Sequence, residues 1–66
     1  MGTDAQVSYA LWLLDTLGYG TKKMTPKFKE IGAREDEIHG SVIAWLVPMH
    51  RTKCGNLIEG LKERLP

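Results

Sequence analysis

Apolar side chains cover most of the circumference of a predicted helix over residues 4–17, and only Ser8 and Asp15 mark a polar strip. A helix that is apolar on nearly every side is normally buried on more than one side. We therefore predict that helix 4–17 is the central element of the fold.

The ends of this helix and a second, shorter helix follow from local signals. Thr3 and Gln6 have the spacing of a capping box, and Gly18 supplies a left-handed stop. Residues 26–31 begin with proline, which fits the first position of a helix, and are followed by glycine. We predict a short helix there that is pinned to the core by its apolar residues.

A third helix is predicted from residue 33 to about residue 47. Its first turn holds Glu35, Asp36 and Glu37, which complement the positive end of a helix dipole. The apolar residues that then share one stripe are Ile38, Val42, Trp45, Leu46 and Met49. The alternative for residues 41–47 is a buried strand after a break at Gly40, because the run is rich in β-branched residues.

Pro48 stops or bends this helix, and a last helix is predicted over residues 52–65 with Thr52 as its cap. Its narrow apolar stripe consists of Cys54, Leu57, Ile58, Leu61 and Leu65. The sequence therefore predicts a single all-α domain over residues 1–66, with three main helices and one short helix packed around helix 4–17.

The chain is short enough for self-association to be expected. Ordering its 66 residues costs about 1.5 kcal/mol per residue, so roughly 100 kcal/mol must be recovered, which needs on the order of 4,000 Å² of apolar burial. Cys54 is the only cysteine, so no disulfide within the chain can contribute. A partner that covers further apolar surface is the remaining source of stability, and we predict a homodimer.

The predicted dimer interface is the second flank of helix 33–47, formed by Gly40, Ile43, Ala44 and Val47. Gly40 and Ala44 are small and four residues apart, so another helix can approach closely. A two-fold axis would bury the same patch of each copy against itself. The alternative is that helix 52–65 covers this flank within one chain.

The net charge is only +1, but charged residues of the same sign cluster along the sequence. The basic residues that could contact phosphates or an acidic partner are Lys22, Lys23, Lys27, Lys29, Arg51 and Lys53. The alternative is that they only solvate the surface. We see no secretory leader and no apolar run of the ~20 residues that span a bilayer, so we expect a cytoplasmic protein.

No recognised catalytic motif is present, and we expect neither enzymatic activity nor a cofactor. A zinc site would need more ligands than His39, His50 and Cys54 provide within one chain, so no metal is expected. We interpret Cys54 as a small core residue and His50 as a solvated turn residue.

The segment from Phe28 to Trp45 resembles the helix-turn-helix of phage repressors, with Gly32 as the turn glycine and Ile38 as the buried residue of the second helix. The likeness implies DNA binding through the helix that follows the turn. The sequence departs from that pattern because this helix would begin with three carboxylates, which repel phosphates. We therefore expect a non-enzymatic regulatory or interaction module that binds a protein through an apolar helix face, with a helix-turn-helix-like DNA-binding regulator as the alternative.

Overall fold

The computed structural model describes residues 3–66, and every regular element in that range is helical. In chain order the elements are α1 (Asp4–Thr16), the 3₁₀ helices η1 (Pro26–Ile31) and η2 (Glu35–Glu37), α2 (Val42–Leu46) and α3 (Arg51–Glu63). The predicted all-α fold is confirmed. The only β-type pairing in this range is an isolated bridge between Lys23 and Ser41.

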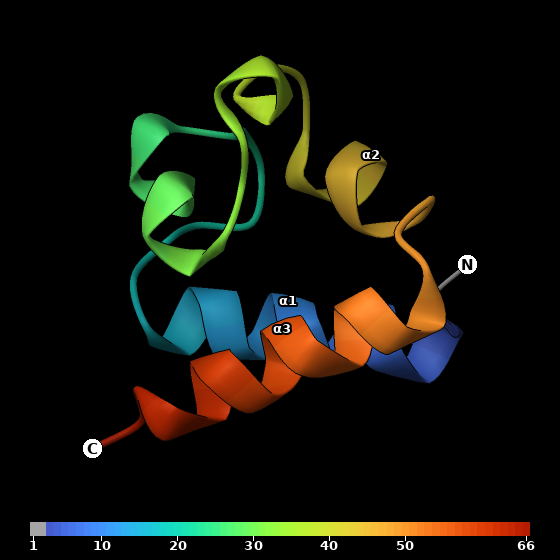
Figure 1. The fold of residues 1–66 in the computed structure, drawn as a ribbon. Coiled ribbons are helices and arrows are strands. Elements are labelled where there is room, and N and C mark those ends of the chain that lie inside the picture. Colours follow the sequence, from blue (N-terminus) through green and yellow to red (C-terminus); the bar gives the residue numbers. More distant parts are fainter. Residues whose placement is uncertain (1–2) are drawn as a thin grey trace.

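The first and last helices form a pair, and the rest of the chain covers one side of it. Figure 1 shows α1 and α3 side by side, with residues 17–50 arching over them. The fully buried side chains come from α1, η1, α2 and α3: Ala10, Leu13, Leu14, Phe28, Val42, Leu46, Cys54 and Leu61. Burial of these residues along one side of each helix is what an amphipathic pattern predicts.

Local signals set the ends of α1 as expected. The backbone N–H of Gln6 donates to Thr3 Oγ1 at 3.1 Å, and that of Thr3 donates to Gln6 Oε1 at 3.2 Å, which completes the predicted capping box. Gly18 follows the helix with φ 85°, and Tyr19 N–H donates back to the Leu14 carbonyl at 2.9 Å. A left-handed residue at this position satisfies carbonyls that the last turn leaves open.

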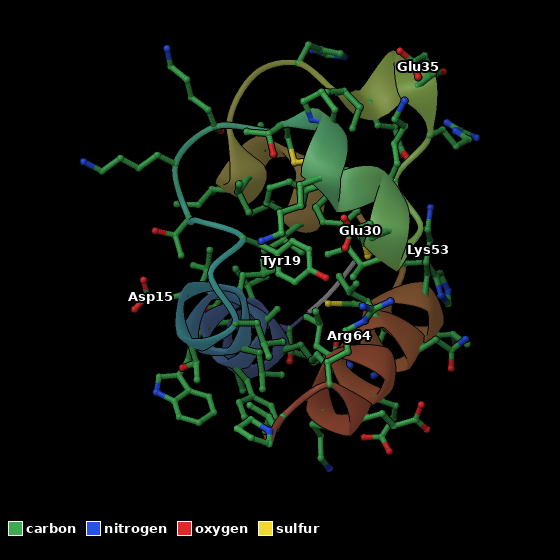
Figure 2. All side chains as sticks on the ribbon, turned by 90° about the vertical axis from the view of Figure 1, so that its left-hand side faces the viewer. Asp15, Tyr19, Glu30, Glu35, Lys53 and Arg64 are labelled. Atoms are coloured by element: carbon green, nitrogen blue, oxygen red, sulfur yellow. The ribbon has the colours of Figure 1, made fainter. Side chains whose placement is uncertain are left out.

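The prediction that α1 is buried on more than one side is only partly met. Val7 and Leu11 are half-buried against the core, but Tyr9 is 41% exposed and Trp12 is 54% exposed. In Figure 2, which looks nearly along α1 (blue), the other helices lie above it and to its right. One long face of α1 is therefore uncovered.

The predicted continuous helix from residue 33 to 47 is wrong, and so is the strand alternative for residues 41–47. The backbone leaves the helical region at Ile38 and turns at Gly40, which has φ 69°. Hydrogen bonds to the preceding loop hold the break: Met24 N–H donates to the Gly40 carbonyl at 3.0 Å and Val42 N–H donates to the Lys22 carbonyl at 2.9 Å.

A new helix then begins after the break. Ser41 is the N-cap of α2, and its Oγ accepts from Ala44 N–H at 3.0 Å. A glycine followed by serine is a stop signal followed by a start signal. This pair was the local evidence against one continuous helix.

The last helix was predicted to begin one residue too late and to end two residues too late, and with the wrong cap. The N-cap of α3 is His50, whose Nδ1 accepts from Thr52 N–H at 3.1 Å. The interpretation of His50 as only a solvated turn residue therefore missed its capping role. None of the helices in residues 3–66 is long and apolar enough to cross a membrane.

Candidate protein-interaction face

The short helix α2 presents two different faces. Val42 and Leu46 are fully buried and Trp45 is 9% exposed, whereas Ile43 is 51% and Val47 41% exposed. α3 lies along α1 and leaves Ile43 and Val47 open to solvent. The flank that the sequence singled out is thus an exposed apolar surface, and the alternative in which the C-terminal helix covers it is wrong.

Small residues and a hollow lie beside these two apolar side chains. Gly40 and Ala44 are both exposed, and they form part of a hollow of about 220 Å³. Its lining residues are Glu37, His39, Gly40, Ala44, Trp45 and Pro48. We call the surface formed by Gly40, Ile43, Ala44 and Val47 the α2 face.

The hollow continues toward the start of α3. A second hollow of about 260 Å³ shares Glu37, Trp45 and Pro48 with the first and is bounded on its other side by His50 and Lys53. The two hollows together form a groove, and its lining includes apolar side chains, the carboxylate of Glu37 and the ammonium group of Lys53.

Trp45 connects this groove to the core. Its ring packs edge-on against Phe28, with centroids 5.6 Å apart and planes at 83°. Among residues 3–66, its Nε1 is the only buried side-chain nitrogen or oxygen that lacks a hydrogen-bond partner. Burying an unsatisfied donor costs about 1–3 kcal/mol, so the unpaired Nε1–H of Trp45 lowers the free energy of unfolding.

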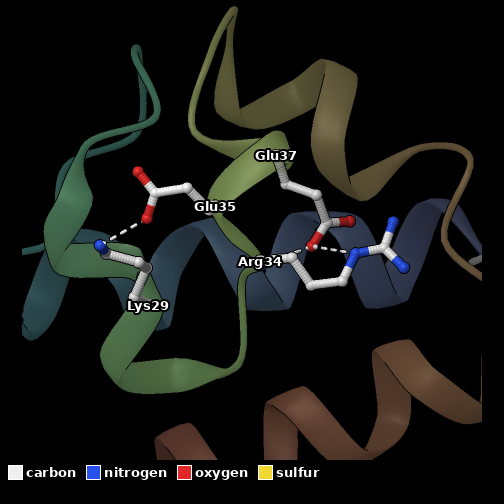
Figure 3. A network of polar contacts seen from close by, with 4 residues as sticks. All are labelled: Lys29, Arg34, Glu35 and Glu37. Carbon is white, nitrogen blue, oxygen red and sulfur yellow. Dashed lines mark hydrogen bonds and ion pairs between the residues drawn. The ribbon is translucent and has the colours of Figure 1, made fainter.

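The acidic residues of η2 are paired with cations from the same part of the chain. Lys29 Nζ lies 2.7 Å from a carboxylate oxygen of Glu35. Figure 3 shows this ion pair, and it shows Glu37 beside Arg34. Glu37 Oε1 accepts from the backbone N–H of Arg34 at 2.8 Å, and Arg34 Nε lies 3.3 Å from Asp36. Exposed ion pairs of this kind add little stability, but they leave cations beside the carboxylates rather than a single-sign acidic surface.

The basic residues are spread over several elements. Lys22 and Lys23 are exposed in the loop before η1, and Arg51 and Lys53 are exposed in the first turn of α3. The ammonium group of Lys27 lies 4.8 Å from the ring centroid of Tyr19. Two of the four lysines in the first group, Lys27 and Lys29, therefore have partners within the chain.

Sequence reasoning missed a polar junction between α1, η1 and α3. Figure 2 shows Tyr19, Glu30 and Arg64 together at one end of the helix pair. Tyr19 Oη donates to Glu30 Oε1 at 3.4 Å, and Arg64 Nη2 donates to the Glu30 carbonyl at 3.0 Å. These contacts join residues far apart in the sequence, and no local spacing signals them.

An exposed aromatic pair on α1 was also missed. Tyr9 and Trp12 stack with ring centroids 6.1 Å apart and an angle of 17° between the planes. The prediction counted Trp12 among the apolar residues that surround helix 4–17 and gave no role to Tyr9. Only the position of α3 shows which side of α1 remains open.

The potential nucleophile and metal ligands do not converge. Cys54 is fully buried, as predicted for a core residue, and burial raises the pKa of its thiol above the ordinary value. A raised pKa lowers the fraction of reactive thiolate. Within residues 3–66 no group of three or more histidine, cysteine or acidic side chains is placed to hold a metal ion.

Comparison with known proteins yields no match to a protein family model, to a curated protein or to a solved structure.

Proposed function

We propose that the protein is a non-enzymatic interaction module that binds another protein through the α2 face and also associates as a homodimer. The observation that carries the proposal is the exposure of Ile43 and Val47 on a helix whose opposite side is fully buried. Large apolar side chains that gather beside an apolar groove are typical of protein-binding surfaces.

The chemistry of the face favours a helical partner. Ala44 has no long side chain to hold a second helix away, and Ile43 and Val47 offer apolar area beside it. Gly40, at the break before α2, leaves open space next to them. An amphipathic helix that lays its apolar face across such a surface is a recurrent mode of recognition. Glu37 and Lys53, which both line the groove, would then pair with polar residues that border that apolar face.

Ile43→Glu tests the proposal. Because Ile43 is 51% exposed, a carboxylate there is expected to leave the fold intact while it repels an apolar partner. Proteins from a lysate of the source cell would be captured on the immobilised wild-type chain and identified by mass spectrometry. A partner found in this way would then be purified and titrated against the wild-type and the Ile43→Glu chains. The resonances of α2 and of the groove should shift on binding to the wild type.

The matched control is Trp12→Ala, which removes an equally exposed apolar side chain from a different helix. Binding that survives Trp12→Ala and is lost in Ile43→Glu supports the α2 face. Equal binding by all three chains would show that the face has no part in recognition.

The DNA-binding alternative has less support from the geometry. A protein that recognises DNA as phage repressors do needs a helix that enters the major groove. The segment that would supply this helix contains a three-residue 3₁₀ turn, a bend at Gly40 and the five-residue α2. Titration of a nonspecific duplex at two salt concentrations separates the two functions. A DNA binder should show an affinity whose logarithm falls linearly with the logarithm of the salt concentration.

A further inference from the structure

A third hollow, of about 210 Å³, lies next to the groove, between the end of η1, the turn that joins α2 to α3, and the first half of α3. Its lining combines apolar side chains with Lys53 and Asn56. We propose that this hollow binds a small apolar carboxylate, which is an anion made of one carboxylate group and an apolar body the size of a phenyl ring. The site is separate from the α2 face, because none of the four residues of that face lines it.

The apolar lining comes from four different places in the fold: Ile31 of η1, Trp45 of α2, Met49 of the turn and Leu57 of α3. Gly32 adds no side chain, and a Cβ built on it would meet no atom within 4 Å, so the hollow stays open beside it. An apolar cavity of about 150 Å³ accommodates benzene. The hollow therefore has room for a six-membered ring and a short substituent.

Lys53 gives the hollow a positive charge that no acidic side chain balances. This residue is exposed, and the ion pairs within residues 3–66 involve Lys29, Arg34 and Lys62 instead. The first turn of α3 also holds Arg51 and no acidic residue. The positive end of the helix dipole lies in the same turn, so an anion bound there is stabilised.

The carboxylate that shares the groove with Lys53 is already engaged. Glu37 lines the second hollow together with Lys53, but it does not line the third. Its Oε1 accepts from the backbone N–H of Arg34 at 2.8 Å, and Arg34 Nε lies 3.8 Å away. A ligand carboxylate in the third hollow therefore reaches Lys53 without lying against Glu37.

Trp45 borders the hollow with an unused hydrogen-bond donor. It is 9% exposed and lines all three hollows, and its Nε1–H has no partner within residues 3–66. Bulk water does not reach this nitrogen, so an acceptor has to enter between the lining side chains. A carboxylate oxygen is a strong acceptor and would remove the cost of the unpaired donor. The other oxygen would face Lys53 and the side-chain amide of Asn56.

The single ammonium group in the lining matches a single negative charge. A phosphate monoester carries about −1.5 to −2 charges at neutral pH, and apolar walls leave its oxygens without donors. An ammonium ligand is repelled by Lys53, and a neutral amide gains no ion pair. Charge and apolar lining together favour a monoanion with an apolar body.

NMR titration of the isotope-labelled full chain tests the site with three matched probes. Phenylacetate has both parts of the proposed ligand, phenylacetamide lacks the charge, and acetate lacks the apolar body. A ligand of this size in an open hollow should bind with a Kd on the order of millimolar. Phenylacetate should bind at least about 3-fold more tightly than either of the other probes, as one exposed charge-assisted contact supplies.

The two tryptophans give an internal control in the same spectra. The indole N–H resonance of Trp45 should move downfield when phenylacetate binds, whereas that of Trp12, which is exposed on α1, should not. The spectrum of Trp12→Ala assigns the two resonances. Equal movement of both would indicate non-specific adsorption and would overturn the site, as would phenylacetate binding that leaves the Trp45 resonance in place.

Variants of the lysines decide whether charge recognition belongs to the hollow. Lys53→Gln should abolish the preference for phenylacetate over phenylacetamide, whereas Lys22→Gln, at an exposed lysine outside the hollow, should keep it. Ile43→Glu should also keep it, because Ile43 does not line the hollow, so failure of this site and failure of partner binding by the α2 face are distinguishable. Equal binding of the three probes to the wild type, no binding at all, or a preference that survives Lys53→Gln would overturn the proposal.

N-acetylphenylalanine distinguishes two sources of the same chemistry. It reproduces the C-terminal residue of a protein, and its amide is the neutral control. Binding that is tighter than that of phenylacetate and lost in the amide would support the hollow as a receptor for a protein C-terminus. Weaker binding than that of phenylacetate would support it as a site for a free small acid.

Discussion

Phe28 and Trp45 meet edge to face in the core, with ring centroids 5.6 Å apart. Phe28 comes from η1 and Trp45 from α2, two short elements joined by a stretch with little regular structure. Tyr19 extends the cluster, with its ring centroid 5.9 Å from that of Phe28. This aromatic cluster therefore fastens the irregular half of the chain to the α1–α3 pair.

Trp45→Ala should destabilise the domain by ~3–5 kcal/mol, because it leaves a large cavity in the aromatic cluster. A loss of that size can unfold a domain of this length, and thermal unfolding followed by circular dichroism would measure it. Trp45→Phe is the matched variant. It keeps an aromatic ring and removes the buried Nε1–H that has no partner, so it should lose clearly less stability. A well-folded Trp45→Ala chain that had lost only partner binding would show that Trp45 is a contact residue instead.

Gly40 and Gly60 should respond oppositely to replacement by alanine. Gly40 has φ 69° at the break before α2, where an L-residue with a Cβ is strained, so Gly40→Ala should cost about 1–2 kcal/mol. Gly60 lies inside α3, and an added Cβ there would meet no atom within 4 Å. Gly60→Ala should therefore stabilise the chain by about 0.5–1 kcal/mol. Urea titration of both variants measures the difference, and equal effects would contradict the assignment of a break at Gly40.

Changing Lys22, Lys23, Lys27 and Lys29 to glutamine should leave both the fold and partner binding intact. All four are exposed, and surface substitutions away from special features usually shift stability by no more than about 0.5 kcal/mol. Lys22→Gln with Lys23→Gln is the cleaner pair, because Lys27 and Lys29 contact Tyr19 and Glu35. Loss of binding without loss of fold would instead indicate a phosphate-bearing or acidic partner.

Cys54 should react slowly with iodoacetamide in the native chain and rapidly in denaturant, since it is fully buried and free. Burial raises the pKa of this thiol above its ordinary value of 9.0. The folded chain then retains a proton that the unfolded chain loses, so the contribution of Cys54 to stability is present below about pH 9 and declines as the pH rises further.

The pH dependence can be isolated by comparison with Cys54→Ala. That variant loses some packing at every pH but lacks the titrating group. The difference in stability between the two chains should shrink between neutral pH and pH values above 9.0. A constant difference would mean that the thiol titrates alike in the folded and unfolded states.

The sequence by itself determined the features that depend on neighbouring residues. The capping box of Thr3 and Gln6, the stop at Gly18 and the proline-led η1 are made by side chains and backbone groups a few positions apart. The identities of core residues such as Trp45 and Cys54 also followed from the sequence, because a periodic apolar stripe must be buried somewhere.

Only the tertiary structure decided where the chain breaks and which apolar surface stays open. The bend at Gly40 is held by hydrogen bonds to Lys22 and Met24, which lie far away in the sequence. Trp12 and Ile43 carry the same apolar character as buried residues, yet both are more than half exposed. Periodicity states which side chains share a face of a helix, but whether another element covers that face depends on packing between distant segments.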